Sequence, residues 1–291
     1  MRHDEFAFVI YRNKVDTKIS KLHRMAYIAW IRLKIFTGYR LRFALDILGI
    51  CISVLQYLLL SLLANPQDLA RLGYGTDYFA FVVWGVALAR YVWDLVGMMV
   101  HWVWHEISSG TFGVIVSTTT SIKLWLMGQA LFSTVWASIW FMGVILVASL
   151  VGFHPSLSIF QLIQTVFVIL VMIIIHAGIG IMFTGISIYH KQVDVLVFLL
   201  AGIIEMFGGV IYPLSLLWNI PVLYYVALAL PFTHGLEIIR KVAISGYSIL
   251  TPPLLTHFIV LLSFVWIIPL GFKTVDYYLA KARRTGDVFS Y

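Results

Sequence analysis

Long apolar runs separated by short polar segments occupy most of the chain. An apolar run of about 20 residues can cross the roughly 30 Å hydrocarbon core of a bilayer as a helix. Six runs meet this length, at residues 44–63, 78–103, 124–151, 159–188, 193–211 and 254–272. The pattern therefore predicts an all-α, polytopic membrane protein whose six transmembrane helices fill residues 44–272.

The segment before the first span, residues 1–43, has a different pattern. In residues 19–43 the apolar positions recur at intervals near three, four or seven, and most basic residues fall between them. Such a stripe with basic flanks is typical of a helix that lies in the membrane interface. A solvated basic tail is the alternative. The apolar positions are Leu22, Met25, Ala29, Leu33, Phe36 and Phe43.

Residues 105–121 join the second and third spans with a polar opening, four apolar positions and a Ser/Thr run. This pattern predicts a short amphipathic helix, with Ser108 or Ser109 as its N-cap. A helix of this kind is either connecting structure or a lever that docks on another subunit.

Residues 208–246 are too apolar for a solvated loop, yet Pro213, Pro221 and Pro231 cut them into pieces too short to span. Non-helical backbone at membrane depth is tolerated only under protein or in a water-filled cavity. We therefore expect a re-entrant, external helical hairpin between spans five and six. Its residues Glu237, Arg240 and Lys241 have the spacing to pair on one helix face.

The composition agrees with a membrane chain. Hydrophobic residues make up 61% and charged residues 11%, with a mean hydropathy of +0.95, whereas soluble domains carry about a quarter charged residues. The sequence has no G-x-x-x-x-G-K-[ST] motif, so we expect no nucleotide-binding loop. The single cysteine, Cys51, can form no intramolecular disulfide and suits a membrane helix.

The net charge of +7 is distributed unevenly. With six spans, sixteen of the twenty Lys and Arg residues fall on one side, including ten in residues 1–43 and four in the C-terminal tail, residues 273–291. Because basic residues favour the cytoplasmic side, we expect both termini in the cytoplasm and the chain in the cytoplasmic membrane. The first residues also lack a signal-peptide layout. This distribution indicates a membrane partner and no nucleic acid.

A few ionisable residues lie inside the predicted spans, where they usually face a bundle interior or a cavity. Arg90 and Asp94 have the spacing of an ion pair, and His101 and His105 follow on nearly the same stripe. Glu205 lies deep in span five. We take Arg90, Asp94 and Glu205 as candidates for a substrate pathway. A structural ion pair for the first two, and a hydrogen bond between protomers for Glu205, are the alternatives.

Three features, in this order, carry a resemblance to a known family. The first is the basic interfacial helix, and the second is Glu106 followed by Gly110-Thr111 and the run 117–121. The third runs from Tyr212-Pro213-Leu214 through the Leu-Pro-Phe-Thr-His turn at 230–234 to Arg240 and Gly246. Together they resemble the permease subunits of type-2 class ATP-binding-cassette (ABC) exporters. One departure is Gly113 after Phe112, where many relatives have an acid after a leucine.

The resemblance implies a homodimer that works with two separate ATPase subunits, which bind ATP and Mg. The permease itself would hold no cofactor and no metal, and would move an amphipathic drug, lipid or lipid-linked glycan at the homodimer interface. ATPase coupling would fall to Glu106, Ser109, Gly110, Thr111, Phe112, Tyr189 and Lys191. The external re-entrant segment would include Pro213, Pro231, Thr233, His234, Glu237 and Arg240.

Two other classes stay open. An ion-driven secondary transporter or channel often has paired discontinuous helices in two repeats, and only one such segment is present here. A membrane metalloenzyme would need more than His101 and His105, which form one edge of a metal site at best, because the other histidines are scattered.

Overall fold

The computed structural model describes residues 20–118, 121–155, 157–191 and 193–286. Of these residues, 83% are helical and none lies in a strand. The helices, in chain order, are α2 (Lys21–Thr37), α3 (Arg40–Ser61), α4 (Pro66–Arg71), α5 (Tyr78–Ser108), α6 (Phe112–Ser117), α7 (Ile122–Leu150), α8 (Ile159–His190), α9 (Asp194–Phe207), η1 (Leu214–Asn219), α10 (Pro221–Leu228), α11 (Pro231–Ala243), α12 (Pro252–Ser263), η2 (Phe264–Trp266) and α13 (Ile267–Thr285).

Five stretches of helix are long and apolar enough to cross a membrane, which indicates a multi-pass membrane protein. They correspond to the first, second, third, fourth and sixth expected spans. The helices α10 and α11 pass the same test only as a pair, and they are bent by 86° at their junction. The five are Phe43–Ser61, Tyr78–Ser108, Ile122–Leu150, Ile159–His190 and Pro252–Thr285.

The expected fifth span, residues 193–211, is shorter in the structure. Its helix, α9, has 14 residues, or roughly 21 Å at 1.5 Å per residue, less than the hydrocarbon thickness. It ends at Phe207 because Gly208 and Gly209 follow, and Gly209 has a φ of +73° that does not continue a helix. The boundaries of the two terminal segments also differ from the expected ones, residues 1–43 and 273–291. Helix α3 begins at Arg40, inside the first segment, and α13 continues to Thr285, inside the second.

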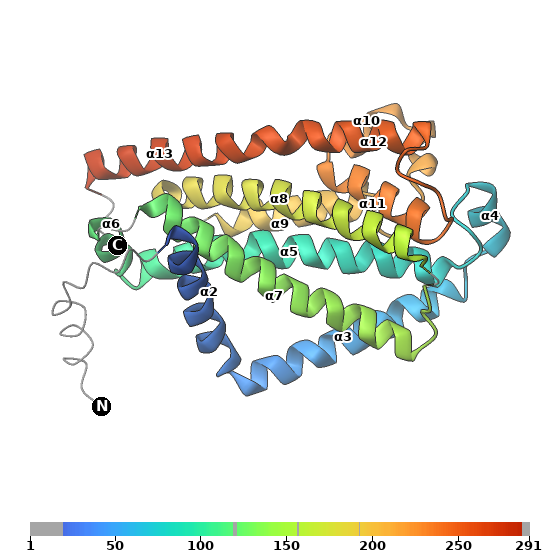
Figure 1. Cartoon of the computed structure of the whole chain (residues 1–291), viewed down its shortest axis with the longest axis horizontal. Coiled ribbons are helices and arrows are strands. Elements are labelled where there is room, and N and C mark those ends of the chain that lie inside the picture. The colour runs from blue at the N-terminus through green and yellow to red at the C-terminus, as the bar shows by residue number, and fades with distance from the viewer. Residues whose placement is uncertain (1–19, 119–120, 156, 192, 287–291) are drawn as a thin grey trace.

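The long helices run along one axis, and α2 crosses that direction steeply (Figure 1). The helix α6 and the end of α13 lie at one end of the molecule, the α6 end, and α4 lies at the other, the α4 end. Helix α5 is central, since it packs against α7, α8 and α9. In its most apolar 18-residue stretch 72% is buried, whereas in that of α3 only 11% is buried. Helix α3 therefore lies at the edge of the bundle.

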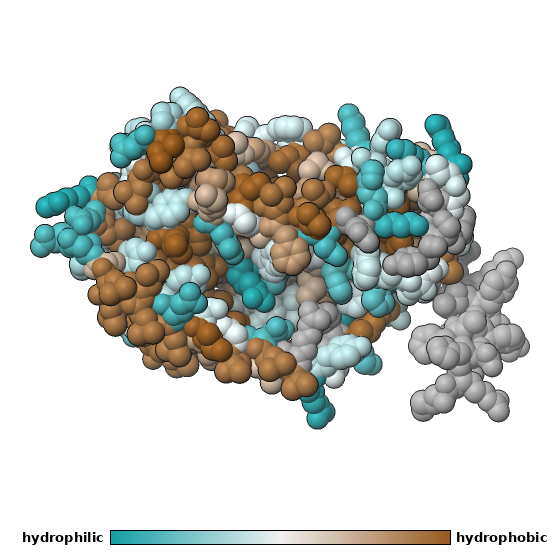
Figure 2. Space-filling view, turned by 180° about the vertical axis from the view of Figure 1, so that it is seen from behind, coloured by the Kyte–Doolittle hydropathy of each residue, from teal (hydrophilic) through white to brown (hydrophobic). Residues whose placement is uncertain are grey.

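The surface agrees with a lipid environment. Brown, hydrophobic residues cover much of the face in Figure 2, while teal residues lie at its two ends and also across its middle. Large apolar side chains on α3 and α8 are exposed, among them Leu48, Leu59, Phe160 and Ile163. Exposed apolar surface on this scale is normal where lipid replaces water.

Helices α8 and α13 are packed so closely that glycine is required between them. A Cβ atom at Gly185 would lie 2.8 Å from the backbone nitrogen of Val275, and one at Gly271 would lie 2.7 Å from the carbonyl oxygen of Gly178. Small residues let membrane helices approach in this way.

We expect Gly185→Ala to destabilise the protein by about 1–3 kcal/mol, because the added methyl group meets backbone that must move. The matched control is Gly49→Ala, at a helical position where a Cβ meets nothing within 4 Å. Thermal unfolding in detergent checks both. A loss of stability of the same size in the two variants would contradict the close α8–α13 contact.

Candidate functional site

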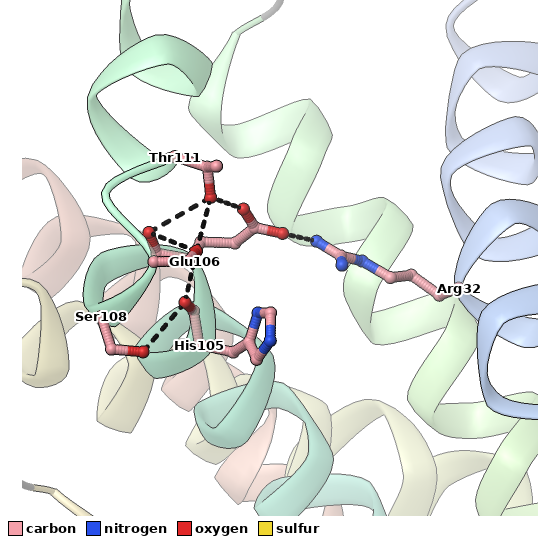
Figure 3. Close-up of polar contacts among 6 residues, drawn as sticks. Arg32, His105, Glu106, Ser108 and Thr111 are labelled. Atoms are coloured by element: carbon pink, nitrogen blue, oxygen red, sulfur yellow. Dashed lines mark hydrogen bonds and ion pairs between the residues drawn. The ribbon is translucent and has the colours of Figure 1, made fainter. Parts of the chain in front are cut away.

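An ion pair joins α2 to the end of α5. The Arg32 guanidinium donates to one oxygen of the Glu106 carboxylate, and the Thr111 hydroxyl donates to the other. Each side chain of the ion pair is only 11% exposed. The hydroxyls of Ser109 and Thr111 lie 2.9 Å apart beside them. We call Arg32, Glu106, Ser109 and Thr111 the Glu106 node; Figure 3 shows Glu106 between Arg32 and Thr111.

Arg32 also reaches a third helix. Its guanidinium carbon lies 4.2 Å above the centre of the Trp102 ring of α5. Gln129 of α7 is buried beside Arg32. When its amide oxygen faces the guanidinium, that oxygen accepts from Arg32 Nε at 3.1 Å and from Nη2 at 3.2 Å. One side chain therefore links α2, α5 and α7. A partner 74 residues away leaves no local sequence signal, and the sequence indicated Arg32 only as a basic flank.

The apolar stripe expected on α2 packs on protein for part of its length. Ala29 is buried and Leu33 contacts the main core. Ile28 lies so close to Gly128 of α7 that a Cβ there would be 2.9 Å from the Ile28 Cβ. Tyr27 and Trp30 are exposed on the remaining surface. Phe36 belongs to the expected stripe, but its side chain lies outside the described part.

The turn before α6 is shaped by Gly110, whose φ is +74° and around which a Cβ would meet nothing within 4 Å. The expected N-cap is wrong: Thr111 precedes α6 and makes no capping bond, while the Ser108 and Ser109 hydroxyls donate to the His105 carbonyl at 3.0 and 2.8 Å. These serines therefore close the end of α5. The same carbonyl also accepts the backbone N–H of Ser109 at 2.9 Å, and serine hydroxyls commonly bond back to a carbonyl of the preceding turn.

Phe112 faces inward and Val114 faces outward. The Phe112 ring packs edge-to-face on Trp125, with 6.2 Å between ring centres, and is buried. Val114 is 65% exposed, and Ser109, Gly110 and Thr111 are exposed beside it. Phe112 anchors α6, so the accessible part of the expected coupling segment is the turn and Val114.

Tyr189 and Lys191 lie at the C-terminal end of α8. The Tyr189 ring stacks on Tyr278 of α13, with 6.1 Å between ring centres, and the Lys281 ammonium lies 4.1 Å from its centre. Lys191 follows α8 with a φ of +60°. Tyr189 therefore ties α8 to α13 near the end of the bundle that carries α6.

Two cavities lie beside α5: the large one is between α3, α5 and α9, and the small one is between the same helices and α7. The large cavity has a volume of about 540 Å³ and the small cavity about 300 Å³. Both are lined by Arg90, Trp93, Val197 and Phe198, and the Trp93 and Phe198 rings are 5.0 Å apart. This aromatic pair stands where the two cavities meet.

The three pathway candidates all line these cavities. The predicted ion pair is confirmed: Arg90 Nε lies 2.7 Å from Asp94 Oδ2. Arg90 lines both cavities, Asp94 the small one and Glu205 the large one. His101 lines the small cavity, together with Asp46 of α3. The geometry therefore gathers residues that are far apart in the sequence around one space.

The buried Arg240 of α11 donates hydrogen bonds to backbone carbonyls. It donates from Nε to the Phe81 carbonyl at 2.9 Å, from Nη1 to the Gly209 carbonyl at 2.6 Å, and from Nη2 to the Val210 carbonyl. The Gly209 and Val210 carbonyls follow the end of α9, where no helix satisfies them. Gly85 admits this contact, because a Cβ there would lie 2.1 Å from the Val210 oxygen.

The expected pairing among Glu237, Arg240 and Lys241 is therefore wrong. The Glu237 carboxylate accepts from the Tyr74 hydroxyl at 2.7 and 2.8 Å, and Lys241 donates to the Leu72 and Gly73 carbonyls at 2.9 Å each. Burial, and then the Glu237 charge, raise the pKa of Tyr74, so its hydroxyl stays protonated and remains a donor. These contacts tie α11 to the turn between α4 and α5.

The other residues expected in the external segment are buried around the same helix. Pro231 begins α11 and Pro213 precedes η1, while Thr233 is 2% exposed. The His234 ring lies 2.9 Å, Nδ1 to Nδ1, from His257 of α12, and its Nε2 donates to the Leu228 carbonyl at 2.8 Å. These contacts attach α11 to α10 and α12.

No family model matches the chain, and no curated protein does. Among the residues that the structure describes, no three His, Cys, Asp or Glu side chains are grouped as a metal site would need.

We expect Glu106→Ala to destabilise the protein by about 3 kcal/mol, because Arg32 would stay buried without its counter-charge. Replacing both residues by methionine should restore most of that loss, since an apolar pair leaves no charge behind. Thermal unfolding in detergent measures the three proteins.

The control is Asp276→Asn, which breaks the half-exposed pair with Lys123 and should cost at most about 1 kcal/mol. Equal stability of Glu106→Ala and the original protein would show that the Glu106 node does not hold α2 in place.

Proposed function

We propose that the chain is the permease subunit of an ATP-driven ABC-type exporter in the cytoplasmic membrane, with its ATPase on separate subunits. The observation that carries this proposal is the Glu106 node. It joins an exposed turn at one end of the bundle to α2 and α5 through a nearly buried ion pair. A turn attached in this way can transmit a movement of a bound subunit to α2 and α5.

The proposed topology has six crossings. Five of them are the long apolar helices. The remaining one, fifth along the chain, is the short helix α9, and Arg240 donates to the Gly209 carbonyl just after its end. The bent pair α10 and α11 forms the external re-entrant hairpin. The α6 end faces the cytoplasm, because Lys123, Lys191 and Arg283 lie near the ends of helices there. In this orientation both termini are cytoplasmic.

In the proposed mechanism, ATP binding brings the two ATPase subunits together, and each presses on the turn at Gly110 and on Val114. Because Arg32 binds Glu106, α2 and α5 move with the turn as one body, a rigid-body transmission into the membrane. Tyr189 and Lys191 supply a second contact near the same surface. Helix α2 lies in the membrane interface, with Tyr27 and Trp30 towards the headgroups.

The substrate passes between two copies of the chain. Only 11% of the most apolar stretch of α3 is buried. The exposed surface of α3, beside the two cavities, therefore has room for a second copy. The two cavities form each copy's half of the pathway. An amphipathic drug, lipid or lipid-linked glycan is the class of substrate, because the walls combine apolar and charged groups.

An ion-driven transporter or channel is the second candidate. The observation in its favour is the Arg90–Asp94 pair beside Glu205, since intramembrane charges also mark ion pathways. It predicts transport that depends on a cation gradient and needs no ATPase.

The test compares Gly110→Trp with Gly152→Trp. Both glycines have a positive φ, +74° and +113°, and a Cβ at either meets nothing within 4 Å. They lie in the turns after α5 and after α7, at opposite ends of these antiparallel helices. We expect the tagged chain, isolated from its source membranes, to carry an ATPase. Gly110→Trp should lower the associated ATP hydrolysis about tenfold, and Gly152→Trp should leave it nearly unchanged.

Two results would contradict the proposal. One is equal ATP hydrolysis with both tryptophan variants, which would remove the turn from the ATPase contact. The other is transport in proteoliposomes that follows a cation gradient without any ATPase, which would favour the second candidate.

A further inference from the structure

We propose that the two cavities select a hydrophobic cation, so that the exported molecule is a cationic amphiphile. This assignment rests on the proposed function, because it names the class of substrate that the pathway accepts. The large cavity, at about 540 Å³, is within the roughly 300–1,000 Å³ range of small-molecule sites. Its lining residues decide the class.

Aromatic rings form much of both walls. Trp93 and Phe198, 5.0 Å apart, stand between the cavities. Tyr57 lines the large cavity, and Trp136 and Trp140 line the small one. The face of an aromatic ring attracts a cation, most strongly when both are out of water. Such walls bind a large apolar ion and favour positive charge.

The charges that line the cavities have the same preference. Arg90 is the one Lys or Arg among the described lining residues, and its charge is already compensated by Asp94 at 2.7 Å. Glu205 lines the large cavity from α9, and no described Lys, Arg or His comes within ion-pair distance of it. A bound cation beside Glu205 would offset the cost of a carboxylate at membrane depth.

The walls of the two cavities are poorly suited to an anion or to a neutral glycan. An anion would have to compete with Asp94 for Arg90 and would lie near Glu205. A neutral glycan would need many hydrogen-bond partners, and Ser53 and Tyr57 supply the only hydroxyls among the described residues that line the large cavity. A cation whose apolar groups contact Trp93 and Phe198 leaves the fewest groups unsatisfied.

The experiment compares two probe ions of nearly equal shape and opposite charge, tetraphenylphosphonium and tetraphenylborate. Saturable binding of each to the purified full chain in detergent is measured by displacement with excess unlabelled ion, which subtracts partition into the micelle. We expect the phosphonium to bind at least tenfold more tightly. Glu205→Gln should weaken its binding about tenfold and leave borate binding unchanged or slightly stronger.

Asp68→Asn is the control variant, since Asp68 is an exposed carboxylate on α4 away from both cavities, and it should bind the phosphonium as the original chain does. Glu205→Asp should retain most of the affinity. The comparison of the two ions on the original chain stands even where a variant fails to fold. Equal affinity for both ions, or unchanged phosphonium affinity in a folded Glu205→Gln, would overturn the proposal.

These outcomes are independent of the ATPase. A chain that carries its ATPase yet binds both ions alike keeps the exporter function and contradicts the cationic substrate. A chain that selects the phosphonium but transports it without an ATPase contradicts ATP-driven export and leaves the charge selectivity of the cavities in place.

Discussion

The nearly buried ion pair between Arg32 and Glu106 determines how the end of the bundle that carries α6 is put together. Two charges out of water are costly unless each finds partners, and here Thr111, Gln129 and the Trp102 ring complete the shell. The pair therefore fixes α2 against α5 and α7, and it fixes the turn before α6 at the same time. An exposed turn that cannot move without moving two helices is the mechanical feature on which the proposed coupling depends.

A second constraint acts near the other end of the bundle. Where an apolar surrounding offers no water, each backbone carbonyl needs a donor from the protein. Helix α9 ends after 14 residues, and Arg240 donates to the carbonyls of Gly209 and Val210 that the helix end leaves open. This contact permits a short helix beside two cavities. It also explains why a charged residue is fully buried on α11 with no ion-pair partner among the described residues.

Hydrophobic length and spacing predicted the parts of the fold that depend on neighbouring residues. The long apolar helices and the Arg90–Asp94 pair follow from such patterns and are confirmed. The partners of Arg240 could not be predicted, because spacing alone favoured Glu237 and the open carbonyls exist only once α9 has ended. The contact between Arg32 and Glu106 joins residues 74 positions apart, a separation at which no periodicity operates. The six crossings, the orientation and the coupling role stay predictions.

The proposed coupling requires the turn before α6 to contact a separate ATPase. Photo-cross-linking from Val114, which is 65% exposed on α6, measures this contact directly in the source membrane. We expect a cross-link to an ATP-binding polypeptide, and we expect its yield to change when ATP is added. A probe at Val114 that reaches only lipid or reagents supplied from outside the cell would contradict the proposed coupling.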